Sequence, residues 1–257
     1  MRFMIMHKTD AHWEGGATPG PQLIARVGAL IGELATSGIL QGAEGLRASS
    51  QGVRLTFSGD TPTVIRGPFK GANELPAGFS ILRASSIDEV IDWATRQAQA
   101  LRDTEIDIRP VTEPWDIGMG AAPANMTTRR YMVLRKATAA TEAGTAPTVT
   151  QRSGLLRLIE ETTRTGVHVV TETMHPSARG RRYTNARDGV SFFDGPFLET
   201  KEMIGGYVIV SADSLADAGR WAERYITTVG AKEADVRELE VSWPECQTAD
   251  CRLQIAD

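Results

Sequence analysis

The sequence predicts an α+β protein built from two copies of one unit that follow each other along the chain. Three observations carry this prediction. At 257 residues, the chain has room for one or two domains. It repeats itself without gaps when the residues around position 66 are aligned with those around position 194. In each copy, short apolar runs typical of strands alternate with segments whose apolar residues recur at helical spacing.

The repeat is clearest where Arg66-Gly67-Pro68-Phe69 aligns with Asp194-Gly195-Pro196-Phe197 and Trp93-Ala94 aligns with Trp221-Ala222. Over the first copy this alignment gives about thirty identical pairs, where unrelated sequences of ordinary composition would give about seven. Two unrelated α+β halves would also drift out of register at their loops. We therefore expect a first repeat at 1–118, a linker rich in small residues at 119–128, a second repeat at 129–245 and an unmatched tail at 246–257.

Composition and charge exclude several classes of protein. The formal net charge of −4 lacks the positive field expected of a nucleic-acid-binding protein. No apolar run approaches the roughly 20 residues that a membrane-spanning helix needs. Two cysteines do not make a disulfide framework, so we expect a reducing, cytoplasmic environment and no membrane partner.

The elements of one unit follow in order along the first copy. Apolar residues at helical spacing from Leu23 to Leu34 predict the first helix, and Gly38 stands where a helix can end on a left-handed residue. Ser86, followed by two acidic residues, is a favourable start for a second helix. The predicted strands are Phe3–His7, Ile39–Leu46, Val53–Phe57, Thr63–Ile65, Phe79–Leu82 and Glu105–Val111.

This order of strands and helices predicts a ferredoxin-like unit with an added hairpin. Two helices cover only one face of such a sheet, which leaves the other apolar face open. Two copies on one chain can bury these open faces against each other and so form an internal pseudo-dimer. Further dimerisation of the whole chain is compatible with this arrangement.

One segment of the second copy carries a specific signature. It runs from Asp194-Gly195-Pro196-Phe197 to Glu202 and continues as Ile204-Gly205-Gly206-Tyr207, while the first copy has a degraded version that begins with Arg66. These residues resemble the DGPF branch of the YCII-related family, here repeated in tandem. The resemblance implies a dimeric α+β barrel with a cleft between the two units.

The resemblance implies function less specifically than fold. Some relatives are similar to small-molecule lyases or dehydrochlorinases that use a His–Asp pair, and others are encoded beside extracytoplasmic-function sigma factors. This chain departs from the catalytic pattern, because neither first helix contains a histidine and the helix ends at Thr36 and Arg164 offer no carboxylate. The family's His–Asp pair therefore cannot be assigned to residues of this chain.

Two glutamates, Glu44 and Glu172, fall inside strands that are otherwise apolar. A carboxylate in such a place must be ion-paired or must have a raised pKa, and a raised pKa suits general acid–base catalysis. We take both glutamates as catalytic candidates. The structural alternative is an ion pair with Arg109 or Arg237.

His168 is the third catalytic candidate, because it stands where the first copy has Leu40. Strand alternation would place His168, Val170 and Glu172 on one face, where His168 and Glu172 could bracket a ligand. A neutral core histidine is the alternative. His175 replaces Arg47 and would point to the opposite face.

Further ligand-binding candidates lie in matching loops of both copies. Lys8 and Lys136 end the first strand of each copy, and Glu14 and Glu142 lie in the loop that follows. A salt-bridged loop is the alternative interpretation. From the second copy we add His175, which replaces Arg47, and the signature residues Asp194 and Lys201 as ligand-binding candidates. His7 and His12 occur only in the first copy and receive no role.

No metal or cofactor is expected. Cys246 and Cys251 are four residues apart on the tail without a neighbouring histidine, which is a poor zinc pattern. The sequence contains none of the common nucleotide, phosphate, zinc-protease or serine-hydrolase motifs.

Together these features favour a cofactor-independent enzyme of the lyase or isomerase type that transfers a proton on a cyclic or aromatic organic acid. The alternative is a non-catalytic ligand- or partner-binding accessory protein linked to a sigma factor. Because the second copy keeps the signature and gains His168, we expect one working site centred on second-copy strands, in which Glu44 matters little.

Overall fold

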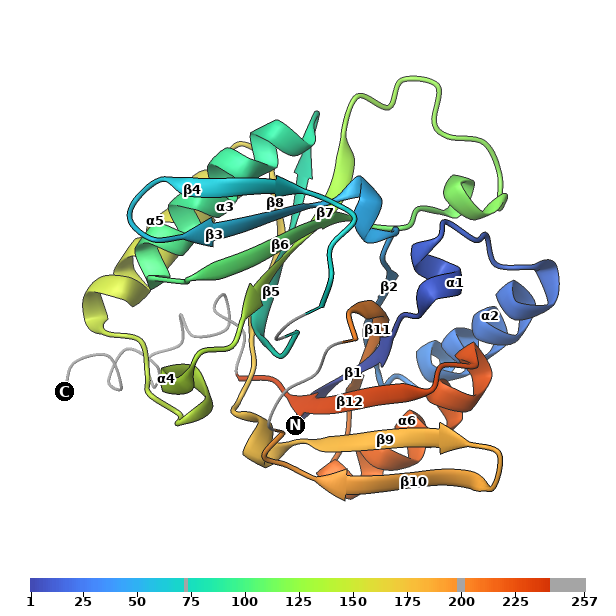
Figure 1. Ribbon diagram of the computed structural model, residues 1–257. Coiled ribbons are helices and arrows are strands. Elements are labelled where there is room, and N and C mark those ends of the chain that lie inside the picture. The colour runs from blue at the N-terminus through green and yellow to red at the C-terminus, as the bar shows by residue number, and fades with distance from the viewer. Residues whose placement is uncertain (72–73, 198–201, 241–257) are drawn as a thin grey trace.

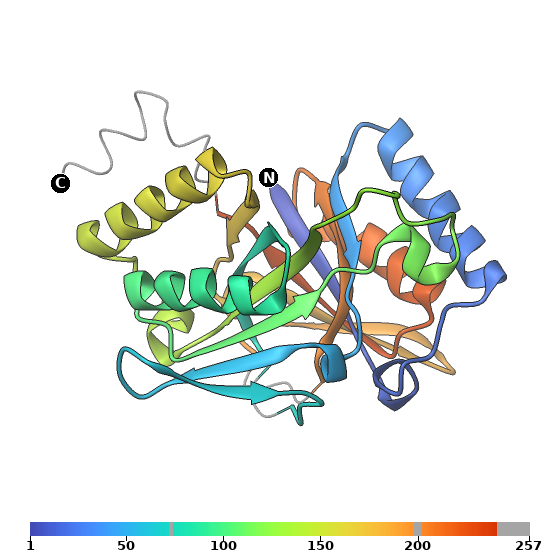
Figure 2. The same cartoon turned by 90° about the horizontal axis from the view of Figure 1, so that it is seen from above.

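The computed structural model describes residues 1–71, 74–197 and 202–240 (Figure 1). Over these residues the chain is a mixed α+β protein with two six-stranded antiparallel sheets. The four long helices lie on the outer sides of the two sheets (Figures 1 and 2). No helix in this part of the chain is long and apolar enough to cross a membrane.

The two aligned halves of the sequence, which we continue to call the first and the second copy, contain the same series of elements. Those of the first copy are β1 (Arg2–Lys8), α1 (Ala11–Glu14), α2 (Pro21–Thr36), β2 (Leu40–Gly45), β3 (Val53–Phe57), β4 (Pro62–Arg66), β5 (Pro76–Ala84), α3 (Ile87–Leu101) and β6 (Glu105–Pro110). Those of the second copy are β7 (Arg129–Lys136), α4 (Ala139–Glu142), α5 (Val149–Arg164), β8 (His168–Thr173), β9 (Arg181–Ala186), β10 (Gly189–Asp194), β11 (Ile204–Ser211), α6 (Leu215–Val229) and β12 (Glu233–Glu238). The predicted order is confirmed, with short helices α1 and α4 added in the loops after β1 and β7.

The long helices begin and end where the sequence places their signals. At the start of α3, the Ser86 side chain accepts a hydrogen bond from the Glu89 N–H. At the start of α6, the Ser214 side chain accepts one from the Asp217 N–H. Gly38, after α2, has a φ of 72°. This left-handed conformation costs glycine nothing, so the chain can turn sharply into β2.

Each sheet contains strands of both copies. One sheet has the order β10-β9-β12-β1-β11-β2, and the other has the order β4-β3-β6-β7-β5-β8. Each sheet therefore takes the first two strands of one copy and the remaining four of the other. The expectation that each copy forms a sheet of its own is wrong. The N-terminal strand β1 lies between β11 and β12 and pairs with both along most of its length, an exchange of equivalent elements.

The helices follow the exchange of strands. Helix α2 packs beside α6 on the sheet that contains β1, and α3 packs beside α5 on the sheet that contains β7 (Figure 2). We call the β1 sheet with α2 and α6 the first module, and the β7 sheet with α3 and α5 the second module. Each module thus combines elements of both copies.

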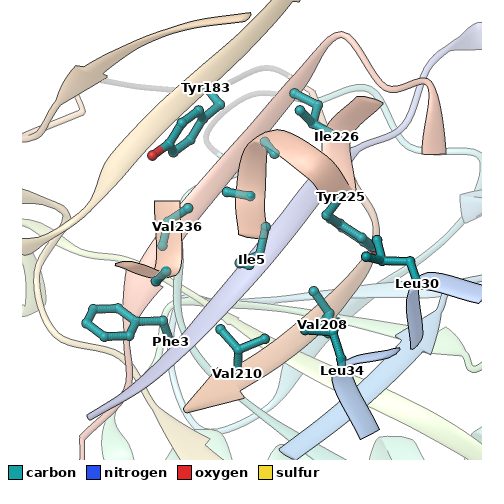
Figure 3. Packing of buried hydrophobic residues seen from close by; sticks show 13 residues of the cluster. Phe3, Ile5, Leu30, Leu34, Tyr183, Val208, Val210, Tyr225, Ile226 and Val236 are labelled. Atoms are coloured by element: carbon teal, nitrogen blue, oxygen red, sulfur yellow. The ribbon is translucent and has the colours of Figure 1, made fainter. Parts of the chain in front are cut away.

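Each sheet is covered on both faces. In the first module, side chains of β1, β11 and β12 meet those of α2 and α6, as Figure 3 shows for Ile5, Leu34, Val208, Ile226 and Val236. Between the two sheets lies a separate core of twelve buried residues, including four methionines. The two sheets therefore bury their inner faces against each other, although each sheet takes strands from both halves of the chain. This burial holds the modules together, because it removes apolar surface from water.

The glycine of the signature has a steric role in both copies. A Cβ on Gly195 would lie 1.9 Å from the carbonyl oxygen of Ser177, and one on Gly67 would lie 1.8 Å from that of Ser49. These distances leave no room for a side chain. The signature glycine is therefore required by the fold, whereas Arg66 and Asp194 before it lie on the surface.

Candidate functional site

A pocket of about 820 Å³ lies in the first module, at the edge where β1 and β2 end and β11 and β12 begin. One wall comes from α2 and another from the end of α6, and residues of the turn at 114–119 also line the pocket. The apolar wall consists of Trp13, Leu23, Ile24, Val27, Ile31, Ala43, Leu46, Ile117, Met119 and Val229. The polar lining includes His7, Lys8, Glu14, Glu44, Arg47, Asp116, Tyr207 and Tyr225.

The pocket reaches around the end of the sheet. Ile31 and Tyr225 belong to the core between the first sheet and its helices, whereas Leu46 and Tyr207 belong to the core between the two sheets. His7 lies on the helix side, since its ring contacts Tyr225 of α6. Such a mostly apolar pocket with a few polar groups is the usual form of a small-molecule site.

His7 and Tyr225 form the most distinctive pair in this pocket. The His7 Nδ1 atom lies 2.8 Å from the Tyr225 hydroxyl oxygen, and the two rings meet edge to face. Gly205 and Gly206 make room for the imidazole, because a Cβ on either would lie within 3 Å of its ring atoms. The Gly-Gly of the signature therefore lets the His7 ring lie against β11.

Burial determines the protonation state of this pair. Loss of solvation, together with the charges of Arg109 and Lys8, lowers the pKa of His7 to about 4. Burial raises the pKa of Tyr225 well above its ordinary value. At neutral pH the imidazole and the phenol are therefore both neutral. The tautomer then decides whether His7 Nε2 donates or accepts a hydrogen bond.

Sequence reasoning missed His7 and Tyr225, although the repeat contains a signal for them. In the second module their aligned positions hold Arg135 and Gln97. There, the Arg135 guanidinium donates two hydrogen bonds to Asp103, at 2.7 and 2.8 Å, inside the protein. The aligned position of Asp103 in the first module is Ala231. The first module thus has His7 and Ala231 in place of the ion pair Arg135–Asp103. It has Tyr225 in place of Gln97.

The two catalytic glutamate candidates have ion-pair partners other than the predicted ones. The Glu44 carboxylate pairs with Arg130, and the Glu172 carboxylate pairs with both terminal nitrogens of Arg2. The predicted partners, Arg109 and Arg237, bind elsewhere. The reason is the exchange of strands, which places the first residues of β1 and β7 opposite the other copy's glutamate.

Only Glu44 of these two glutamates lines the large pocket. Burial raises the pKa of Glu44, and the Arg130 guanidinium opposes this rise. The same guanidinium donates two hydrogen bonds of 2.8 Å to Glu113, just before the turn at 114–119. Glu172 is 2% exposed and lies outside this pocket. The expectation that the site centres on second-copy strands therefore does not match the position of the pocket.

His168 does not share a face with Glu172. The pairing of β5 with β8 shifts register between Ile81 and Leu82, so that Ile81 faces Val170 and Leu82 faces His168. One extra residue turns His168 toward the helices, where Nε2 lies 3.0 Å from the Thr171 hydroxyl oxygen. The prediction of a common face is wrong because of this bulge. Burial lowers the pKa of His168, and the cavity beside it holds only about 10 Å³.

In both copies the loop glutamate forms the ion pair expected of a salt-bridged loop. Glu14 accepts a hydrogen bond from the Ser49 N–H at 2.8 Å and pairs with Arg109 at 3.0 Å. Glu142 makes the same contacts with Ser177 and Arg237. Both glutamates tie the loop after the first strand to the fold, and Glu14 also lines the pocket.

The remaining candidates lie apart from the large pocket. The His175 ring is 3.4 Å from the Arg179 guanidinium, in the loop after β8. Asp194 is exposed and pairs with Arg181 at 2.6 Å. Lys136 is buried in an ion-pair cluster of the second module. Lys201, Cys246 and Cys251 lie outside the described residues. Within those residues, no group of three or more His, Cys, Asp or Glu side chains is placed to hold a metal ion.

Comparison with known proteins identifies a YCII-related domain at residues 130–239. This range begins in β7 and ends one residue after β12, so it covers the second copy. No curated protein and no solved structure matches the chain. Residues 130–239 are therefore a YCII-related domain, and this range contains Tyr207 and Tyr225 of the pocket.

Proposed function

We propose that this protein is a cofactor-independent enzyme of the lyase or isomerase type, which binds a small cyclic or aromatic organic acid in the first-module pocket and transfers a proton on it. The observation that carries this proposal is the His7–Tyr225 pair in the wall of an otherwise apolar pocket. A histidine held by a hydrogen bond at one ring nitrogen can exchange a proton at the other. Among the described residues, no other side chain is hydrogen-bonded to the His7 ring.

The charges around His7 favour an anionic substrate. Burial and the positive charges of Arg109 and Lys8 disfavour the imidazolium. A substrate anion in the pocket would offset these charges and raise the pKa of His7 toward the range of a useful base. His7 would then gain basicity when the substrate binds.

The proposal extends to the origin of the fold. We propose that the chain is a tandem duplication of the DGPF branch, whose ferredoxin-like repeats form a dimeric α+β barrel within one chain. Support comes from matching contacts in the two copies. The Phe69 N–H donates to the Ser49 hydroxyl at 3.2 Å, and the Phe197 N–H donates to the Ser177 hydroxyl at 3.0 Å.

Exchange of substrate protons with solvent tests the enzymatic function before the substrate is known. A panel of cyclic and aromatic organic acids is incubated with the intact chain in D₂O, and loss of C–H signals is followed by proton NMR. We expect at least one acid to exchange, and His7→Gln to slow that exchange by about 100-fold, within the range for general acid–base catalysis. Exchange at an unchanged rate in His7→Gln would contradict the role of His7.

The alternative function is a non-catalytic binding protein, and one observation favours it. With a pKa of about 4, the free His7 imidazole is a weak base at neutral pH. A binding protein would take up acids of the panel without exchanging any of their protons. The NMR experiment separates the two functions, because ligand signals broaden on binding even where no exchange occurs.

A further inference from the structure

The two modules contain equivalent clusters of buried charges that differ in one carboxylate. In the second module, Lys136 and Arg54 meet Asp107 and Glu74, with nitrogen–oxygen distances of 2.6–2.8 Å to Asp107. All four side chains are at most 8% exposed. Each cation contacts both carboxylates, so two positive and two negative charges close a ring.

In the first module, three of the four aligned residues keep this arrangement. Lys8 Nζ lies 2.9 Å from Asp235, and Arg182 Nε lies 2.6 Å from the same carboxylate. The fourth residue is Glu202, aligned with Glu74, and it is exposed. Within the described part of the chain, Asp235 is the only carboxylate that Lys8 contacts, and Lys8 Nζ makes no hydrogen bond to another residue.

Other charges nearby do not explain this difference. Glu233 lies 3.5 Å from Arg182, and its counterpart Glu105 lies 3.6 Å from Arg54, so these glutamates contribute equally to the two clusters. Although burial alone would raise it, the charges of Lys8 and Arg182 hold the pKa of Asp235 below its ordinary value. Asp235 is therefore ionised already. Among the described residues, the first-module cluster therefore has the same two cations as the second but one buried carboxylate fewer.

Lys8, Glu202 and Glu233 all line the large pocket, so the pocket reaches this cluster. A buried ammonium group is costly unless a second charge or hydrogen-bond acceptor compensates it. In the second module the protein provides that acceptor with Glu74. In the first module the corresponding place adjoins a cavity, which a ligand can enter.

We propose that Lys8 binds the carboxylate of the substrate, which takes the place that the Glu74 carboxylate has in the second module. This inference rests on the proposed function, and it assigns the group that recognises the acid. The ligand class is a monocarboxylate with an apolar ring, because the rest of the wall is largely apolar. Lys8 is thereby a binding residue, whereas the aligned Lys136 is structural.

A pair of probes with one ring system separates recognition of the acid from binding of the ring. The intact chain is titrated by calorimetry with 2-naphthoate and with its uncharged analogue 2-naphthamide. The variants are Lys8→Met and Glu202→Gln. Gly28→Trp serves as the blocked pocket, since Gly28 lines the pocket and the space around its Cβ position is open.

Four results support the proposal together. The unmodified chain binds 2-naphthoate about tenfold more tightly than 2-naphthamide, as expected for a charge-assisted hydrogen bond. Lys8→Met removes this preference and leaves the affinity for 2-naphthamide within about twofold. Glu202→Gln raises the affinity for 2-naphthoate, because a competing negative charge is gone. Gly28→Trp abolishes binding of both probes.

Failure of this inference differs from failure of the proposed function. Equal binding of the two probes, or an equal loss of both in Lys8→Met, overturns the carboxylate site while the pocket remains a ligand site. Binding of neither probe overturns both. If Lys8→Met fails to fold, Glu202→Gln still decides: an unchanged preference for 2-naphthoate contradicts competition at Lys8.

Discussion

The first and second modules have the same series of strands, the same helix pair and the same loop contacts, yet the pocket of about 820 Å³ lies in the first, whereas the cavity beside His168 in the second holds about 10 Å³. The second module fills the corresponding region with the buried Arg135–Asp103 pair. The first module has His7 and Ala231 at these positions. Two modules with one architecture thus differ at a few aligned positions, and in our proposal these differences give binding to the first module and an added ion pair to the second.

The helices show the same contrast. In the second module, the Gln151 side chain of α5 donates to the backbone carbonyl of Leu101 at 2.7 Å, which ties the start of α5 to the end of α3. In the first module, the aligned residues Leu23 and Val229 both line the pocket instead. Two apolar side chains thus replace a hydrogen bond between the helices and leave the aligned place as part of the pocket wall.

The largest expected effect comes from converting the first module into the second. The double variant His7→Arg/Ala231→Asp imports the buried ion pair and should lower the affinity for 2-naphthamide more than 100-fold, because the guanidinium fills the pocket. His7→Arg alone should destabilise the protein by about 3–5 kcal/mol, since it buries an uncompensated charge. Calorimetry and urea unfolding measure the two effects. A double variant no more stable than His7→Arg would contradict the equivalence of the modules.

The next effect distinguishes the two buried lysines. Lys136→Met leaves Arg54 facing two buried carboxylates and should cost about 3–5 kcal/mol of unfolding free energy. Lys8→Met leaves Asp235 balanced by Arg182 and should cost less than half as much. Urea unfolding of both variants at pH 7 gives the comparison. Equal losses would mean that the charge clusters are balanced alike in the two modules.

A smaller effect is expected on the free energy of unfolding, which should depend on pH because His7 is buried. Its pKa is about 4 when folded, against an ordinary 6.5, so the unfolded chain binds a proton that the folded chain does not between these values. Stability should therefore fall as pH falls from 6.5 to 4, by about 2–3 kcal/mol from this residue. His7→Gln keeps a hydrogen-bonding side chain and should flatten this part of the curve. A variant with the same pH dependence as the unmodified chain would refute the buried, neutral state of His7.

The smallest effect is expected at Asp194. Its side chain is 62% exposed in its pair with Arg181, and exposed ion pairs contribute little. Asp194→Ala should change the unfolding free energy by about 1 kcal/mol or less and leave binding of 2-naphthoate unchanged. A clear loss of binding would restore Asp194 as a ligand-binding residue.

Much of the fold could be predicted because its signals are local. Such signals depend only on residues close by in the sequence. Examples are the helical spacing from Leu23 to Leu34, the cap at Ser86 and the turn at Gly38. The exchange of strands could not be predicted, because the two copies have similar strands. β1 could pair with strands of its own copy or with β11 and β12. Both pairings fit the same alternation of apolar and polar residues along the strands.

The site was harder to predict than the fold. Glu44 was chosen as a charge inside an otherwise apolar strand and Lys8 as a matched residue at the end of one, and both line the pocket. His7 was overlooked because its partner Tyr225 is 218 residues away, and its burial depends on helices from both copies. A single added residue in β8 was enough to turn His168 away from Glu172, and no sequence pattern marks that bulge.

We propose that the ligand site lies in the first module, without an equivalent site among the described residues of the second. Calorimetric titration of 2-naphthoate into Gly28→Trp and into the aligned variant Leu156→Trp tests this most directly. We predict one site per chain, lost in Gly28→Trp and retained in Leu156→Trp. Two sites per chain, or a loss of binding in Leu156→Trp as large as that in Gly28→Trp with both variants folded, would contradict the claim.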